Sequence, residues 1–331
     1  MMLTAFGALL VGFVLLIWSA DRFVLGATCT ARIFGISPLI IGVVVVGFGT
    51  SAPEMLVSAI AAYNGQPGLA IGNALGSNIT NIGLILGTTA LCYPLVVKSK
   101  IVQRELPVML LLMLAGVTLM LDGNLDRRDG SLLFGCLILL ISWSIYEAHR
   151  HRDDHLAAEL NADQPPELSA SAALLWLLIG LVVLVASSRL LVWAATQIAV
   201  ALGVSDLIIG LTVVALGTSL PELAASIAAA RKSEYDIAIG NVVGSNMFNL
   251  LGVMALPGLI APGPFEPAVI QRDYPMMLLL SVLLWFFASN FSLNKGGRLT
   301  RIEGAVLLSL YVAYLGLLYW VTNSTMLPGS G

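Results

Sequence analysis

The chain has 331 residues, of which 58% are hydrophobic and only 11% are charged, and its formal net charge at pH 7 is −3. A soluble protein of this length carries far more charge on its surface, so the composition indicates an integral membrane protein. The small net charge argues against a nucleic-acid partner. The three cysteines are odd in number and lack the spacing of a metal or redox motif.

Hydropathy predicts ten membrane-spanning helices, each close to the length that crosses about 30 Å of hydrocarbon. We expect these helices over residues 3–20, 37–63, 69–91, 106–121, 130–147, 170–190, 205–230, 236–260, 274–290 and 302–321. The only long polar stretch is 147–169, which has a high density of charge and a Pro-Pro pair. We therefore predict two domains, 1–146 and 170–331, joined by a linker over 147–169.

The Lys and Arg residues of the short loops predict the orientation of the spans. The loops on one side carry twelve of these residues, and the loops on the other side carry four. The richer side should face the cytoplasm, which places both termini outside and the 147–169 linker in the cytoplasm. We see no targeting segment and no large soluble insertion, and this favours a prokaryotic plasma membrane.

One block of the first half recurs in the second half at a constant offset of 168 residues. Residues 42–81 align without a gap with residues 210–249, and 19 of the 40 positions are identical. The matching polar positions are Thr50 with Thr218, Ser51 with Ser219, Glu54 with Glu222, Asn73 with Asn241, Ser77 with Ser245, Asn78 with Asn246, and Asn81 with Asn249. Five spans thus correspond to five spans, and an odd number of crossings inverts the second half, as in many secondary transporters.

Each block carries a carboxylate and several hydroxyl and amide groups in the middle of an apolar span. Ionisable groups are costly there, so by default they mark a functional site. Repeated and interrupted hydrophobic segments at corresponding places in two halves point to the binding site of a transporter. We therefore interpret the two blocks as the two sides of one cation site.

A proline near the middle of each block predicts an interruption of the helix. Pro53 cannot donate a backbone hydrogen bond, so we expect a kink or break around 47–53 and at the matching place in the second half. Backbone carbonyls freed there can face a cavity. We expect Glu54 and Glu222 each to begin the half-helix that follows, where the positive helix end favours a carboxylate.

Both blocks collect oxygen ligands and contain neither His nor Cys. Hard cations such as Ca²⁺ and Na⁺ prefer such ligands, and two halves can supply the roughly six to eight oxygens that surround Ca²⁺. Two carboxylates that share a site of low dielectric constant repel each other when the site is empty. A carrier that reorients only after cations have neutralised such a site is an exchanger.

The paired motifs resemble the alpha repeats of the calcium/cation antiporter superfamily. They read GTSAPE followed by GNALGSNITN, and GTSLPE followed by GNVVGSNMFN. The similarity is greatest to the prokaryotic sodium/calcium exchanger-like proteins and covers nearly the whole chain. It implies an all-α integral membrane protein of ten transmembrane helices in two inverted five-helix repeats. The four repeat helices would line the site, and the first and sixth spans would slide as gates.

The resemblance also implies how the site residues divide between the cations. Ca²⁺ would be held by Glu54, Glu222, Thr50 and Thr218. The Na⁺ sites would share Ser51, Ser219, Ser77, Ser245 and the carbonyls of Gly47 and Ala215. Two amides, Asn81 and Asn249, complete the expected site. Some relatives carry Asp in place of Asn249, so the two neutral amides leave the number of Na⁺ ions or protons per Ca²⁺ open.

Structural roles compete with ion binding at several of these positions. The serines could serve close helix packing or bond the preceding turn of their own helix. The four asparagines Asn73, Asn78, Asn241 and Asn246 could equally cap half-helices or bridge helices. The Arg-acid pairs that begin at Arg104 and Arg272 are better explained as anchors at the ends of spans.

The leading hypothesis is a secondary antiporter that exchanges Ca²⁺ for Na⁺ by alternating access at a central site. Its substrates are ions, its partner is the lipid bilayer, and it needs no cofactor; a monomer would suffice, and the oligomeric state is not predicted. The alternative is an antiporter of the same fold that couples Ca²⁺ or another divalent cation to H⁺. A channel is less favoured because pores usually use rings of symmetric subunits. An enzyme is least favoured because the spans hold no Ser/His, Cys/His or HExxH arrangement.

Overall fold

The computed structural model describes residues 2–98, 101–150, 168–202, 215–289 and 297–326. Within these ranges, nine helices are long and apolar enough to cross a membrane. They are Met2–Phe34, Pro38–Tyr63, Pro67–Cys92, Ile101–Leu119, Arg127–Arg150, Ala170–Ala201, Tyr235–Ile260, Val269–Ser289 and Arg301–Val321. The predicted span 205–230 begins outside the described residues and continues in two short helices. The predicted all-α integral membrane fold is confirmed.

The helices of the two halves begin and end at corresponding residues. The first half contains α1 (Met2–Phe34), α2 (Pro38–Ile40), η1 (Ile41–Val46), α3 (Gly47–Tyr63), α4 (Pro67–Thr80), η2 (Asn81–Leu86), α5 (Gly87–Cys92), η3 (Ile101–Glu105), α6 (Leu106–Leu119) and α7 (Arg127–Arg150). The second half contains α9 (Ala170–Ala201), α11 (Ala215–Thr218), α12 (Leu220–Arg231), α13 (Tyr235–Phe248), η5 (Asn249–Val253), α14 (Ala255–Ile260), η6 (Val269–Asp273), α15 (Tyr274–Ser289) and α16 (Arg301–Met326). Here η denotes a π-helix. Most bounds repeat at the offset of 168, so the repeat in the sequence is also a repeat in the structure.

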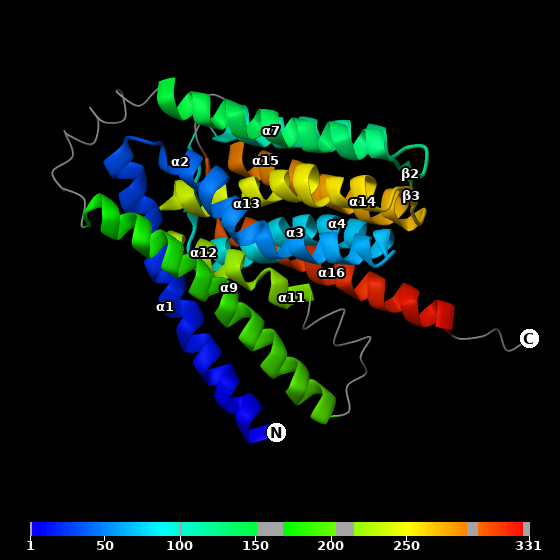
Figure 1. The fold of residues 1–331 in the computed structure, drawn as a ribbon, viewed down its shortest axis with the longest axis horizontal. Coiled ribbons are helices and arrows are strands. Elements are labelled where there is room, and N and C mark those ends of the chain that lie inside the picture. The colour runs from blue at the N-terminus through cyan, green and yellow to red at the C-terminus, as the bar shows by residue number, and fades with distance from the viewer. Residues whose placement is uncertain (1, 99–100, 151–167, 203–214, 290–296, 327–331) are drawn as a thin grey trace, which may run out of the picture.

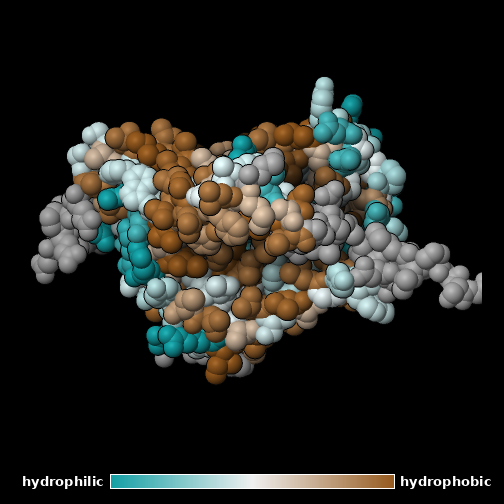
Figure 2. All heavy atoms as spheres, turned by 90° about the horizontal axis from the view of Figure 1, so that it is seen from below, coloured by the Kyte–Doolittle hydropathy of each residue, from teal (hydrophilic) through white to brown (hydrophobic). Residues whose placement is uncertain are grey.

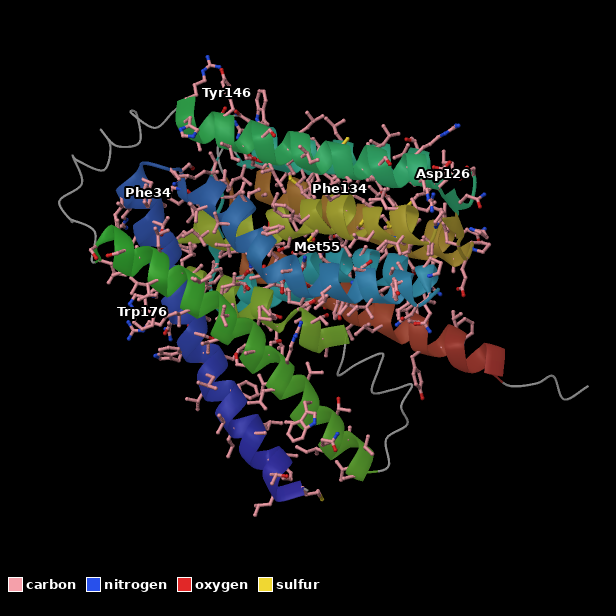
Figure 3. All side chains as sticks on the ribbon, in the orientation of Figure 1. Phe34, Met55, Asp126, Phe134, Tyr146 and Trp176 are labelled. Carbon is pink, nitrogen blue, oxygen red and sulfur yellow. The ribbon has the colours of Figure 1, made fainter. Side chains whose placement is uncertain are left out.

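Two long helices, α1 and α9, lie against each other and run obliquely to the other helices (Figure 1). The rings of Trp18 and Trp176 meet edge to face with their centroids 5.8 Å apart. The Arg22 guanidinium carbon lies 5.0 Å from the centroid of the Trp176 ring, which Figure 3 labels on α9. Glycines allow the close approach, because a Cβ atom at Gly180 would lie 2.6 Å from the Phe23 Cα atom. These two helices therefore form a layer of their own.

Both helices of this layer extend past the C-terminal ends of the predicted spans 3–20 and 170–190, so the predicted ends are wrong, whereas the predicted start at 170 is confirmed. The α1 helix continues past its apolar run because its polar residues find partners at the α12 to α13 connection. Arg231 donates to the Asp21 carboxylate at 2.6 Å, and Arg32 pairs with Glu234 at 3.5 Å. These contacts stabilise the helix beyond the end of the hydrophobic run.

The connection between the halves differs from the prediction at its start. Residues 147–150 belong to α7, where Glu147 accepts from Arg104 at 2.6 Å. This contact ties α7 to η3 and extends the helix into the predicted linker. Most of the linker, residues 151–167, lies outside the described residues.

The opposite end of α7 is fixed by a local cap. The Asp126 carboxylate accepts from the backbone N–H groups of Arg128 at 2.7 Å and Asp129 at 2.9 Å. These bonds, chiefly the one from Asp129, hold the pKa of Asp126 below its ordinary value. They also satisfy N–H groups that a helix start leaves without a partner, so α7 begins at Arg127. Figure 3 labels Asp126 at this end of α7 and Tyr146 near the other.

Short strands join the connections of one half to those of the other. Strand β1 (Leu95–Val96) pairs with β4 (Arg298–Leu299), and strand β2 (Asn124–Leu125) pairs with β3 (Gly263–Pro264), both antiparallel. In each pair, the segment between the third and fourth spans of one half meets the segment before the last span of the other half. The pairing is therefore reciprocal.

The last helix of each half also packs on the third span of the other half. A Cβ atom at Gly130 of α7 would lie 2.9 Å from the Ala255 carbonyl oxygen of α14. A Cβ atom at Gly304 of α16 would lie 2.8 Å from the Gly87 carbonyl oxygen of α5. Small residues at such contacts let helix backbones approach closely in a membrane. The two halves are interlocked rather than merely adjacent.

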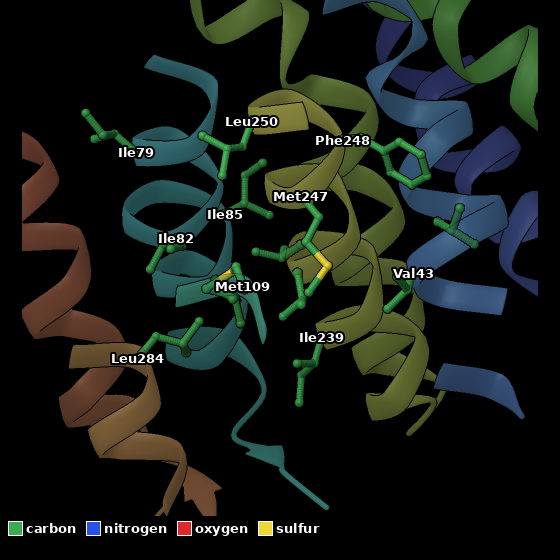
Figure 4. Packing of buried hydrophobic residues seen from close by; sticks show 14 of the residues in the cluster. Val43, Ile79, Ile82, Ile85, Met109, Ile239, Met247, Phe248, Leu250 and Leu284 are labelled. Carbon is green, nitrogen blue, oxygen red and sulfur yellow. The ribbon is translucent and has the colours of Figure 1, made fainter. Parts of the chain in front are cut away.

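The third and eighth spans lie at the centre of the molecule. In their apolar stretches, 72% and 83% of the residues are buried, compared with 22% in α1 and in α9. Figure 4 shows part of the cluster that surrounds them, with Ile82 and Ile85 of η2 near Met109 of α6. Apolar residues dominate the middle of the outer face in Figure 2, as expected for a surface in contact with lipid. These two spans carry the asparagines of the repeat together with Ser77 and Ser245.

We predict that Gly180→Ala separates α1 from α9 and lowers the free energy of unfolding by about 1–3 kcal/mol, because the added methyl group meets the Phe23 backbone. Thermal unfolding in mild detergent measures the change. Gly7→Ala on α1 is the matched control, because a Cβ atom there meets no atom within 4 Å. Equal stability of the two variants would contradict the close contact of the two helices.

Candidate functional site

Polar side chains of the two halves meet where α3 packs on α13. The Thr50 hydroxyl lies 3.1 Å from Asn241 Oδ1 and 3.4 Å from Ser245 Oγ. Ser245 in turn donates to the Gly47 carbonyl oxygen at 3.4 Å. All four residues except Gly47 have polar side chains with no exposed surface. The structure thus brings Gly47, Thr50 and Ser245, which the sequence placed in one site, together at the centre of the protein.

The predicted helix break is present in the second half but not in the first. Helix α11 ends at Thr218 and α12 begins at Leu220, so Ser219 stands between two helices. Helix α3 continues through Pro53 from Gly47 to Tyr63, and the irregular π-helical turns of η1 come before it. The Thr50 hydroxyl donates to the Val46 carbonyl oxygen at 3.0 Å, and this bond joins the end of η1 to the first turn of α3.

This difference changes the position of the two carboxylates in their helices. Glu222 lies in the first turn of α12, as predicted. Glu54 lies in the interior of α3, so the prediction that it begins a half-helix is wrong. The two residues therefore have the same place in the repeat but a different backbone environment.

The carbonyl that Pro221 leaves free has a partner from the oblique layer. A proline removes the backbone hydrogen bond to the carbonyl four residues before it, here that of Gly217. Ser188 of α9 donates to this oxygen at 2.7 Å. The residue that corresponds to Ser188 in α1 is Ala20, which has no hydroxyl group. Only the second half therefore links its oblique helix to the site in this way.

The backbone carbonyl groups of the two glutamates are held by matching amides. Asn73 donates to the Glu54 carbonyl oxygen at 3.0 Å, and Asn241 donates to that of Glu222 at 3.2 Å. Both glutamates are 1% exposed, and the charge of Glu54 acts on the Glu222 carboxylate. Asn73 and Asn241 thus bridge helices, one of the two roles considered for them.

Most of the polar atoms that are buried without a partner belong to this region. Ten buried side-chain polar atoms of the described residues have no hydrogen-bond partner, and seven of them belong to the matching polar positions of the two repeat blocks. These seven are Ser51 Oγ, Glu54 Oε2, Asn78 Oδ1, Asn81 Oδ1, Glu222 Oε2, and Oδ1 and Nδ2 of Asn249. Each unpaired polar group costs about 1–3 kcal/mol in a protein interior. Six of the seven are oxygens, which a bound cation would satisfy.

The two asparagines predicted as ligands begin π-helical segments. Asn81 is the first residue of η2, and Asn249 is the first residue of η5. Such wide turns inside α-helices are frequent at functional sites. Asn81 also donates to Asn246 Oδ1 at 3.0 Å, a contact that crosses between the halves.

The remaining predicted residues surround this centre. Ser77 and Ser219 are buried, with 6% and 2% of their surface exposed. Thr218 and Pro53 line a cavity of about 430 Å³ between α3, α9 and the α11 to α12 segment. Ala215 is the first residue of α11, next to a part of the chain outside the described residues.

Two methionines contact the site asparagines and were missing from the sequence prediction. Asn246 donates to Met109 Sδ at 3.8 Å, and Asn78 donates to Met277 Sδ at 3.3 Å. A methionine in an apolar span is normally taken for core, which explains the omission. Their common offset of 168 was the signal that could have revealed them.

The paired charges at the fourth spans act as anchors, as expected. Arg104 binds Glu105 at 2.8 Å, and Arg272 binds Asp273 at 2.6 Å. Tyr314 of α16 donates to Asp273 at 2.8 Å, while Glu147 of α7 plays the corresponding part for Arg104. The fourth and fifth spans of each half are thus joined at the Arg-acid pair, through the Glu147 carboxylate in the first half and the Tyr314 hydroxyl in the second.

We predict that Ser188→Ala destabilises the protein by about 1–3 kcal/mol, because the Gly217 carbonyl loses its donor. Ser187→Ala is the matched control, since the equally buried Ser187 hydroxyl bonds only the Leu184 carbonyl of its own helix. Thermal unfolding of both variants in the same detergent tests the difference. If Ser187→Ala lowers the free energy of unfolding as much as Ser188→Ala or more, the prediction that the bond between α9 and α11 adds stability is wrong.

Comparison with known proteins gives a consistent result over most of the chain. The family model for sodium/calcium exchanger proteins matches residues 4–146 and 172–320. The putative antiporter CaxA of Alkalimonas amylolytica is 46% identical over 319 residues, which cover 96% of this chain and 99% of that protein. The inner membrane protein YrbG of Escherichia coli (strain K12) is 43% identical over 327 residues, which cover 97% and 98% of the two chains.

A solved structure has the same fold. The sodium-calcium exchanger NCX_Mj, from crystals soaked with zero Na⁺ and Ca²⁺, superposes with a TM-score of 0.83. The sequences are 34% identical, and the match covers 96% of this chain and 100% of that chain. The similarity therefore extends to both halves and to the arrangement of the helices.

Proposed function

The chain belongs to the sodium/calcium exchanger protein family, as its paired motifs predicted, and from this premise we propose that it exchanges Ca²⁺ for Na⁺ across the membrane. In this proposal the ions are substrates, and the protein works by alternating access at one central site. We expect no resident cofactor and no enzymatic step.

The observation that carries the proposal is the set of buried oxygens without partners. It includes one carboxylate oxygen from each half, on Glu54 and Glu222, together with hydroxyl and amide oxygens of the same repeat blocks. A pair of carboxylates in a low-dielectric interior is stable only when paired or neutralised. One Ca²⁺, or several Na⁺, would neutralise the pair and satisfy the oxygens. Reorientation only in the filled states would then couple the two ions.

We assign the ligands as the family resemblance implied. Ca²⁺ is held by Glu54, Glu222, Thr50 and Thr218. The Na⁺ sites share Ser51, Ser219, Ser77, Ser245 and the carbonyls of Gly47 and Ala215, and the amides of Asn81 and Asn249 complete the site. The hydrogen bonds among Gly47, Thr50 and Ser245 support this assignment, because they bring residues of both halves to one place.

The oblique layer of α1 and α9 is suited to the gating role. These helices pack mainly on each other, so they can move relative to the other spans without disturbing the interlocked halves. The hydrogen bond from Ser188 to Gly217 would transmit such movement to the α11 to α12 break. In this proposal, α1 and α9 slide to open the site to each side in turn.

We propose that both termini lie outside and that the linker over 147–169 lies in the cytoplasm. The excess of Lys and Arg on that side supports this orientation. The two domains are 1–146 and 170–331, inverted with respect to each other. The protein would lie in a prokaryotic plasma membrane, and one chain contains all the groups that the site needs.

The neutral amides at positions 81 and 249 favour one second candidate. With only two carboxylates in the site, Ca²⁺ or another divalent cation could exchange for H⁺ instead of Na⁺. The two candidates share the fold and the ligands and differ in the driving ion. Proteoliposomes loaded with Na⁺, loaded with choline, or placed under a pH gradient distinguish them by the uptake of ⁴⁵Ca²⁺.

We predict that Na⁺-loaded vesicles take up ⁴⁵Ca²⁺ and that Glu54→Gln and Glu222→Gln each reduce this uptake at least about a hundredfold, because a buried charge partner of the cation is lost. Glu266→Gln is the matched control, since Glu266 is exposed on a connection outside the site. Its uptake should equal that of the unmodified protein.

Three results would change this conclusion. Uptake driven only by the pH gradient would establish the second candidate. Uptake that needs no counter-ion would exclude an exchanger. Full activity of both glutamate variants would move the site elsewhere in the protein.

A further inference from the structure

Four buried asparagines make up one hydrogen-bonded amide pair and the set that corresponds to it at the offset of 168, which we call the second amide pair. The first amide pair is Asn81 with Asn246, and the second amide pair is Asn249 with Asn78. In the first pair, Asn81 Nδ2 donates to Asn246 Oδ1 at 3.0 Å. In the second pair, Asn78 Oδ1 and both polar atoms of Asn249 have no hydrogen-bond partner among the described residues. The same residues occupy both pairs, yet only the first pair is closed.

One member of each pair is held by a methionine of the other half. Met109 Sδ accepts from Asn246, and Met277 Sδ accepts from Asn78. A thioether sulfur accepts hydrogen bonds but cannot donate them, so it binds only the NH₂ end of an amide. The carbonyl end of each amide is therefore turned away from the methionine. Both methionines are fully buried, and Figure 4 shows Met109 within the apolar cluster.

The closed pair determines which end of Asn81 is available. Its NH₂ group is bonded to Asn246, and its Oδ1 atom is buried without a partner. Asn81 thus presents its carbonyl oxygen in a fixed orientation. Asn249 has no such constraint, because both ends of its amide are unpaired. In this structure, the amide of Asn81 is therefore fixed in orientation, whereas the amide of Asn249 is not.

Complete burial makes this difference important. The four asparagines are at most 1% exposed, so bulk solvent does not reach an open pair. An unpaired buried amide costs free energy comparable to a lost hydrogen bond. An ion at the carbonyl of Asn249 or closure of the second amide pair would remove that cost. Each pair is thus an element with two discrete arrangements.

We propose that Asn246 and Asn78 are positioning residues for the ion ligands Asn81 and Asn249, and that the two amide pairs close in turn during transport. The inference rests on the proposed alternating access between inverted halves. When two such halves exchange conformations, a contact that is closed in one copy opens and its counterpart closes. In the opposite state, Asn249 would be held by Asn78, and Asn81 would be free.

The test replaces each positioning residue by leucine, which has a similar shape and no polar atom. Asn246→Leu removes the pair that is closed here, so it should lower the population of the observed state about fivefold. Asn78→Leu removes the pair that closes in the opposite state, so it should raise that population about fivefold. The double variant should return to the value of the unmodified protein, because both states lose one bond.

Electron-spin distance measurements give the populations without any transport assay. Spin labels at Leu139 on α7 and Leu178 on α9, both exposed, report the movement of the oblique layer relative to the remaining helices. The background variant carries Cys29→Ala, Cys92→Ala and Cys136→Ala. Ser281→Ala is the control, since this buried hydroxyl bonds only the Met277 carbonyl of its own helix, and it should not change the ratio.

Opposite shifts in the two single variants support the proposal, because a general loss of packing would move both in the same direction. Shifts of the same sign, or no shift, would overturn it. If the leucine variants do not fold, Asn246→Ser and Asn78→Ser remove the same bonds with a smaller change. Opposite shifts in a protein that takes up no ⁴⁵Ca²⁺ would retain the paired switch and reject the proposed cargo, whereas normal uptake with unchanged populations would do the reverse.

Discussion

The structure depends on the burial of two carboxylates and their neighbouring oxygens in a membrane protein that supplies few partners for them. Glu54 and Glu222 come from corresponding positions of the two halves and are almost completely buried. Matching amides, Asn73 and Asn241, hold the backbone of each glutamate but leave one carboxylate oxygen of each without a partner. Such a centre is costly unless cations occupy it, and this cost is what can couple occupancy to movement.

Most of the helices around this centre are interlocked, whereas the layer of α1 and α9 is not. Reciprocal strand pairs and glycine contacts join each half to the other, so the helices that carry the site belong to one interlocked body. The α1 and α9 helices pack mainly on each other and contact this body at α12 and α11. A separate oblique layer beside an interlocked body suits alternating access, because movement of the layer can change the side from which the site is reached.

The two halves have nearly the same motif and different structures. Helix α3 passes through Pro53, whereas Ser219 separates α11 from α12. The first amide pair is closed, and the second is open. Part of the difference comes from the neighbours of the motif, since Ser188 of α9 has Ala20 as its counterpart in α1. The rest follows from the fact that inverted halves in any single state need not have the same conformation.

The amino-acid sequence alone determined the membrane class, the family, the two-fold repeat and the residues of the candidate site. These depend on hydropathy and on residue identity at a constant offset, which are local properties. It also predicted the helix break, but that prediction held only at Ser219, because the break depends on what satisfies the carbonyls near the proline.

Only the tertiary structure decided which helices are most buried, how far α1 and α9 extend, and which residues touch the site asparagines. Met109 and Met277 lie on α6 and α15, far in sequence from the amides that they hold, and apart from their common offset of 168 nothing in the sequence distinguishes them from core residues. The same is true of the closed and open amide pairs, whose four members are identical in type. Their difference arises from distances across the interface of the halves, and such distances are set by the packing of the whole protein.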